Sequence, residues 1–202
     1  MSFEDAFLTL QQPVIAVPIV LATMAAFAIA KKPWAAIYVG LMPLINWSFA
    51  AVPTTPIPEW MGGGQFQPLA IVTGLVLVTR DFAQRELKHW IFGAMFVGLG
   101  LSSLTSYLPI IFASGASFLI SETIDWAVYT FSNRPLSQRV LISSAVSAPV
   151  DQIAFLALAS LVTPGILALG TVITGIISKM IGAWIISVFL AHREAQRRMN
   201  PA

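Results

Sequence analysis

A series of long apolar stretches constrains the fold of this chain more than any other feature. A helix needs about 20 mostly apolar residues to cross a bilayer core, because lipid cannot hydrogen-bond an exposed backbone. Stretches of about this length lie near residues 13–30, 34–52, 66–84, 88–107, 110–131, 139–162 and 165–190. The sequence therefore predicts an all-α, polytopic transmembrane helix bundle of about seven spans, forming a single domain over residues 1–202.

The composition agrees with a membrane protein. The chain is 57% apolar and 10% charged, whereas soluble proteins average roughly 45–50% and about 25%. The net charge of +2 does not predict nucleic-acid binding, because the basic residues lie in short connections rather than on one folded face. Cysteine is absent, which excludes disulfides, thiolate metal sites and a Cys nucleophile.

The basic residues predict how the chain is oriented, because Lys and Arg favour cytoplasmic connections. Ten of the eleven fall in alternate connections: Lys31, Lys32, Arg80, Arg85, Lys88, Arg134, Arg139, Arg193, Arg197 and Arg198. The other side receives only Glu4, Asp5 and Glu59. We therefore expect a multi-pass protein of the cytoplasmic (inner) membrane, with its N-terminus outside and its C-terminus in the cytoplasm. Pro13 and Pro18 make the first span the weakest, which leaves a six-span count open.

Four charged residues lie inside predicted spans, where each costs about 2.5–3.5 kcal/mol unless it faces a partner or a watery cavity. Glu122 and Asp125 are three residues apart and share one helix face. Asp151 and Lys179 lie at similar distances on either side of the turn at Pro164, which predicts an ion pair. Structural pairing explains these last two, but it leaves two acids without an intramembrane base. Three acids and one base favour a polar cavity.

The two acidic helices share a pattern. S-x-x-[IV]-D-x-x-[AV]-[FY] begins at Ser121 and again at Ser147, on consecutive spans that run in opposite directions. Transporter sites often lie where inverted repeats meet, and chance similarity between apolar helices is the alternative. Neither H-E-x-x-H nor G-x-x-x-x-G-K-[ST] occurs, so we expect no metal site, no cofactor and no ATP hydrolysis by this chain.

Several of these residues also carry a family resemblance. In chain order they are Asn46, Arg80-Asp81-x-x-Gln84, Ala113-Ser114, Ser121-Glu122-x-x-Asp125 with Tyr129, Asp151 with Phe155, and Lys179. With these motifs, the chain resembles the queuosine-precursor transporter family, also called VUT or YhhQ-like, over about residues 36–190. Residues 1–33 would then add one N-terminal span to a six-span core. The chain departs from the pattern at Val76, where some members carry an acid, and in its Pro-containing first span.

The resemblance implies import of 7-cyano-7-deazaguanine or 7-aminomethyl-7-deazaguanine. One carboxylate can accept both the ring N–H and the exocyclic amine of such a base, and Glu122 is the leading candidate. Asp125 or Asp151 would bind the same edge or hold water, and Lys179 would neutralise Asp151. The remaining predicted contacts are Asn46 and Gln152 to the carbonyl of the base and Trp47 and Trp126 by stacking. Arg80, Asp81 and Gln84 are expected to form a cytoplasmic motif.

Four functions stay open at this point. The first is a self-contained carrier of a purine-like molecule, with proton coupling through one of the acids. The second is the substrate-binding subunit of an energy-coupling vitamin-type importer, which needs a separate ATPase module. An intramembrane enzyme would use paired carboxylates, but no nucleophile, metal set or cofactor motif accompanies them, so we expect no enzyme. A structural protein is the fourth. We expect membrane lipid to surround the protein. Whether the protein forms a homo-oligomer is left open.

Overall fold

The computed structural model describes residues 8, 11–105 and 108–199. Glu4 and Asp5, which the orientation argument used, lie outside the described residues, as do the side chains of Arg197 and Arg198. The α-helices are α2 Pro13–Ile29, α3 Pro33–Ala51, α4 Ala70–Leu87, α5 Ile91–Ser102, α6 Leu108–Phe131, α7 Leu136–Ala159 and α8 Leu169–Met199. The expectation of an all-α chain is confirmed, and each apolar stretch overlaps one of these helices.

The first residues of α5 and α2 have local explanations. α5 starts at Ile91 rather than near residue 88, because the 3-10 turn η2 (Lys88–Trp90) precedes it and Lys88 has a positive φ of 54°. α2 begins at Pro13, where proline fits the first helical turn, and it continues through Pro18 without a break. The two prolines therefore do not shorten the first helix.

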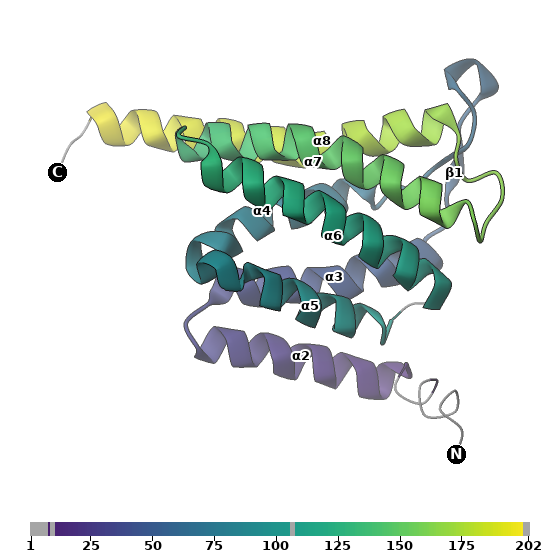
Figure 1. The fold of residues 1–202 in the computed structure, drawn as a ribbon, viewed down its shortest axis with the longest axis horizontal. Coiled ribbons are helices and arrows are strands. Elements are labelled where there is room, and N and C mark those ends of the chain that lie inside the picture. Colours follow the sequence, from purple (N-terminus) through teal and green to yellow (C-terminus); the bar gives the residue numbers. More distant parts are fainter. Residues whose placement is uncertain (1–7, 9–10, 106–107, 200–202) are drawn as a thin grey trace.

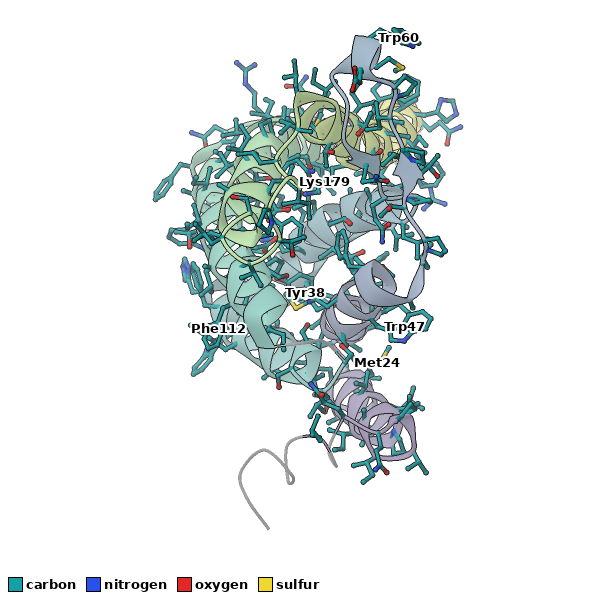
Figure 2. All side chains as sticks on the ribbon, turned by 90° about the vertical axis from the view of Figure 1, so that its right-hand side faces the viewer. Met24, Tyr38, Trp47, Trp60, Phe112 and Lys179 are labelled. Carbon is teal, nitrogen blue, oxygen red and sulfur yellow. The ribbon has the colours of Figure 1, made fainter. Side chains whose placement is uncertain are left out.

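The helices run roughly alongside one another in Figure 1, with α6, α7 and α8 on one side and α2 at the opposite edge. α7 packs between α6 and α8, and α4 joins α8 to α3. α2 packs mainly against α3, where the Met24 side chain lies over Gly40. Figure 2 views the same bundle with the hairpin end towards the reader and shows Lys179 inside it.

The crossing of α4 and α8 is close because glycines face it. A Cβ at Gly74 of α4 would meet the backbone carbonyl of Lys179 in α8, and a Cβ at Gly182 would lie 3.2 Å from the Gly74 carbonyl carbon. Small residues allow helices in a membrane to approach in this way. The approach places Lys179 beside α4, and so it helps to position the charged residues described below.

The connection between α3 and α4 folds into a hairpin over one end of the bundle. Strands β1 (Thr55–Pro56) and β2 (Gln65–Phe66) pair antiparallel, with the 3-10 turn η1 (Glu59–Met61) between them. Gly62, Gly63 and Gly64 all have positive φ, a conformation that glycine adopts without strain. The hairpin is bonded to the start of α8: Gly170 N–H donates to the Gly62 carbonyl at 3.2 Å.

Two segments are long and apolar enough to cross a membrane by length and composition, within the part of the chain that is described: Leu136–Ser160 and Leu169–Gln196. They correspond to α7 and α8. The count of seven spans and the orientation of the termini are finer than this finding, and they stay predictions.

We expect Gly74→Ala to lower the free energy of unfolding by about 1–3 kcal/mol, because the new methyl group meets α8 backbone that cannot rotate away. Thermal unfolding of the purified protein in micelles measures the effect. Gly100→Ala in α5 is the matched control, because nothing lies within 4 Å of a Cβ there. Equal melting temperatures for the two variants would contradict the close crossing.

Candidate functional site

Arg80 lies inside the bundle rather than in a cytoplasmic connection, which corrects the expectation from sequence. It sits on α4, seven residues before the last helical residue, Leu87, and its side chain is fully buried. Asp81 is also fully buried and Gln84 is 6% exposed, so the whole expected cytoplasmic motif faces inward. The argument from basic connections assigned Arg80 by its distance from a span end, and this could not show that its partners lie on another helix.

Arg80 holds three carboxylates. Its Nε lies 2.8 Å from Glu122 Oε2, and its Nη1 lies 2.7 Å from Asp125 Oδ2 and 3.2 Å from Asp81 Oδ1. The Asp125 contact is an ion pair without hydrogen-bond alignment. We call these four residues the Arg80 cluster. Glu122 and Asp125, which the sequence left without an intramembrane base, share this one.

Polar side chains from other helices complete the Arg80 cluster. The Tyr38 hydroxyl of α3 donates to Glu122 Oε2 at 3.0 Å, and Ser143 of α7 donates to Asp81 Oδ2 at 3.3 Å. Arg80 Nη1 donates to Gln84 Oε1 at 2.7 Å, and Gln84 Nε2 donates to Thr130 Oγ1. The cluster therefore joins α3, α4, α6 and α7 through hydrogen bonds that a buried charge requires.

The ion pair predicted between Asp151 and Lys179 is present. Lys179 Nζ of α8 lies 2.6 Å from Asp151 Oδ2 of α7, and Ser121 of α6 donates to the other carboxylate oxygen at 3.2 Å. Lys179 is 3% exposed, and the side chain of Asp151 is 13% exposed. This pair is separate from the Arg80 cluster, so each buried base has its own acidic partners.

The repeated motif has a structural counterpart at the contact of α6 with α7. Ser121 of the first copy donates to Asp151 of the second, and Ser147 of the second donates to Asp125 of the first at 3.4 Å. The two hydrogen bonds are reciprocal, as expected for antiparallel helices that carry the same motif. They link the Asp151–Lys179 pair to the Arg80 cluster.

Two adjoining cavities lie beside the Asp151–Lys179 pair. The outer cavity, of about 200 Å³, lies under the hairpin and is lined by residues of α3, α4, α7, α8 and the hairpin itself. The inner cavity, of about 60 Å³, reaches Asp151 and Ser117. Both share Asn46, Phe49, Phe155 and Lys179, so together they form one polar-ended hollow with Lys179 at the junction.

Two polar atoms at the cavities lack a hydrogen-bond partner among the described residues. They are Gln67 Oε1, on the outer cavity, and Thr73 Oγ1, on the inner one. A buried polar atom without a partner costs about 1–3 kcal/mol. A bound polar molecule or water would remove that cost, so the hollow is suited to a ligand that forms hydrogen bonds.

The cavities contain only some of the predicted contacts. Asn46, Gln152, Asp151 and Lys179 line one or both cavities. Four other candidates line neither: Glu122, Asp125, Trp47 and Trp126. The two acids are held by Arg80, whereas Trp47 is 50% exposed and points away from the bundle in Figure 2.

Trp126 packs in an aromatic group away from the hollow. Its ring lies 5.4 Å from that of Phe92 and 5.8 Å from that of His89, measured between centroids. The sequence missed the aromatic pair that does line the hollow, Phe49 and Phe155, whose centroids are 5.4 Å apart. Phe155 carried a signal, because it closes the second copy of the repeated motif.

No group of three or more His, Asp or Glu side chains suited to a metal ion is found in the described part of the chain. In the Arg80 cluster a guanidinium takes the central position among the carboxylates. The hollow can bind a polar molecule through hydrogen bonds, and the Arg80 cluster holds several charges inside the bundle.

Comparison with known families gives a match over residues 64–192, to the model of the putative vitamin uptake transporters, Vut_1. The chain belongs to this family. The match includes all six charged residues of the two buried groups: Arg80, Asp81, Glu122, Asp125, Asp151 and Lys179. Searches of curated proteins and of solved structures give no match. Membership in the VUT family indicates a membrane transporter of small molecules rather than an enzyme.

We expect Arg80→Leu to lower the free energy of unfolding by about 3–5 kcal/mol, because three buried carboxylates would lose their positive partner. Arg80→Lys should recover only part of this, since one ammonium cannot reproduce the forked contacts of Nε and Nη1. Thermal unfolding in micelles is the measurement, with the exposed Arg85→Gln as control. A wild-type melting temperature for Arg80→Leu would show that the Arg80 cluster does not stabilise the bundle.

Proposed function

We propose that this member of the VUT family imports a flat, polar, nucleobase-like molecule, of the class of 7-cyano-7-deazaguanine and 7-aminomethyl-7-deazaguanine. The observation that carries the proposal is the hollow between Asn46 and Lys179, where amide side chains, an aromatic pair and an ion pair meet beside unpartnered polar atoms. Site and family both support uptake, and the resemblance of the motifs supports the purine-like substrate.

The hollow has the hydrogen-bonding chemistry of a nucleobase site. Four amide side chains line the outer cavity: Asn46, Gln65, Gln67 and Gln152. Amides both donate and accept, which matches the alternating donors and acceptors on the edge of a purine-like base. Gln152 fits because α8 has a glycine opposite it, Gly175, where a Cβ would collide with the amide. Its Nε2 donates to the Thr171 carbonyl at 3.2 Å, which orients the group.

Asp151 replaces Glu122 as the carboxylate that would bind the guanine-like edge. Asp151 lines the inner cavity, whereas both neighbours of Glu122 Oε2 are groups of the protein. A carboxylate can accept from a ring N–H and an exocyclic amine together. In this proposal the ligand competes with Lys179 for Asp151, and the released ammonium then donates to the carbonyl of the base.

Phe49 and Phe155 supply the flat contact that was first assigned to tryptophans. Their rings are tilted by 34° and line both cavities. A planar heterocycle can stack on or between such rings, and base–aromatic stacking is worth about 1–3 kcal/mol per base in nucleic-acid sites. The volume of about 200 Å³ is below the roughly 300–1,000 Å³ of drug-sized sites, which favours a single heterocycle over a larger vitamin.

The proposed orientation predicts which side of the membrane the hollow faces. With seven spans and the N-terminus outside, the hairpin between α3 and α4 faces the outside and the Arg80 cluster lies nearer the cytoplasm. The outer cavity lies under that hairpin, so in this orientation the ligand would enter the hollow from the outer side. Residues 1–33, including α2, would then be an addition at the edge of the core.

Uptake of radiolabelled 7-cyano-7-deazaguanine into liposomes that contain only this protein tests the function. We expect saturable uptake that unlabelled 7-aminomethyl-7-deazaguanine and guanine compete with, and that uracil and thiamine do not, because the hollow fits one purine-like edge. Empty liposomes are the control. Folded protein that binds the ligand but shows no uptake or exchange would instead indicate a binding subunit that needs an ATPase partner. Competition by thiamine alone would contradict the substrate class.

We expect Phe155→Leu to weaken binding of the same ligand about fivefold to 150-fold, because it removes the stacking surface in the hollow. Equilibrium binding of the labelled base to purified protein measures the change. Phe112→Leu is the matched control, since Phe112 is 75% exposed and points outward in Figure 2. Equal affinities for the two variants would place the ligand elsewhere.

A further inference from the structure

The Arg80 cluster carries more negative than positive charge. Its three carboxylates face one guanidinium, so full ionisation gives a formal charge of −2 among fully buried side chains. The Asp151–Lys179 pair is neutral and does not offset this. A net charge at this depth is costly, and membrane proteins that keep such groups commonly use them to move ions or protons.

Glu122 differs from the other two acids in the Arg80 cluster. Both donors that reach it, Tyr38 and Arg80, bond to Oε2. Glu122 Oε1 is buried and no donor among the described residues reaches it. In contrast, both oxygens of Asp81 accept hydrogen bonds, and Asp125 Oδ1 accepts one from Ser147. Glu122 Oε1 is therefore the place where one more proton adds a bond without displacing another.

The groups that face Glu122 come from every helix around it. They are Tyr38 of α3, Arg80 and Asp81 of α4, Asp125 of its own helix and Asp151 of α7, with Lys179 of α8 beyond Asp151. The acids outnumber the bases in this set. A proton on Glu122 lowers the repulsion among them, while Oε2 still accepts from Tyr38 and Arg80.

The Arg80 cluster is also connected to the substrate hollow. Helix α6 carries Ser121, which bonds Asp151 at the inner cavity, one residue before Glu122. The reciprocal bond runs from Ser147, on the same helix as Asp151, to Asp125 in the cluster. A movement of α6 against α7 therefore changes the hollow and the Arg80 cluster together.

We propose that Glu122 is the proton-coupling residue of this transporter, and that one proton bound at its Oε1 crosses the membrane with each substrate molecule. The step is a simple protonation: the carboxylate takes a proton from the outer side and forms one O–H bond, and release to the cytoplasm restores the carboxylate. The inference rests on the proposed function, because it assigns the driving force for that transport.

Proton binding at Glu122 and ligand binding at Asp151 are coupled if each changes the affinity for the other. If a proton on Glu122 and a ligand at Asp151 favour the same arrangement of α6 and α7, each must strengthen the binding of the other by the same factor. Protonation at Oε1 also weakens the ionic attraction between Arg80 of α4 and Glu122 of α6, although Oε2 still accepts from Arg80. The reciprocal serine bonds are the direct physical link between the two sites.

The experiment compares two modes of transport in proteoliposomes. Equilibrium exchange of labelled 7-cyano-7-deazaguanine at equal pH reports the carrier itself, and accumulation with acid outside reports coupling. For one coupled proton, a pH difference of about one unit supports up to roughly tenfold accumulation in the wild type, which a protonophore abolishes. Glu122→Gln should keep exchange and lose accumulation. Glu59→Gln, in the exposed hairpin, is the control and should keep both.

The outcomes separate the two proposals. Exchange without any response of the wild type to the pH difference rejects proton coupling and leaves the proposed function standing. Accumulation by Glu122→Gln equal to that of the wild type rejects Glu122 as the site. Absence of exchange in the wild type rejects the proposed function, and the coupling with it. Infrared difference spectra on a pH jump give a second measurement: a protonated carboxyl band that is present in the wild type and missing from folded Glu122→Gln supports the site, and a wild type without such a band overturns it.

Discussion

A buried guanidinium that must be neutralised organises this bundle. Arg80 cannot leave α4, and in a low-dielectric interior its charge is tolerable only with close carboxylates and complete hydrogen bonding. Glu122 and Asp125 come to it from α6, Tyr38 reaches it through Glu122 from α3, and Ser143 reaches Asp81 from α7. The contacts of α3, α6 and α7 with α4 therefore depend on one charged side chain, and the hollow lies beside these helices at Lys179 of α8.

In the proposed mechanism, two polar centres divide the work of transport. The hollow offers amides, phenyl rings and a neutral ion pair, which suit a flat polar heterocycle. The Arg80 cluster offers excess negative charge and no access for a ligand of that size. The repeated motif ties the centres together, since each copy supplies a serine to the acid of the other. If the proposal holds, substitutions at the hollow change recognition and substitutions at Glu122 change coupling, although both sites share helices α6 and α7.

The sequence predicted the helices and one ion pair because both depend on short-range information. Apolar length fixes a helix, and Asp151 and Lys179 lie on either side of a single turn. Arg80 was misplaced because its partner Glu122 is 42 residues away, and charge counting cannot pair residues across such a distance. The sequence analysis assigned stacking to Trp47 and did not consider Phe49, which lies two positions further along the helix and so about 200° around it. Only the packing of α3 shows which of the two faces the hollow.

The hairpin over the outer cavity has a consequence for access to that cavity. It is held to α8 by the bond from Gly170 N–H to the Gly62 carbonyl and by the bond from Gln65 N–H to Thr171 Oγ1 at 2.9 Å. At a net value of about 1 kcal/mol each, these bonds favour the closed form by roughly thirtyfold. A bias of this size is reversed by a ligand that binds the open form more than about thirtyfold more tightly than the closed form.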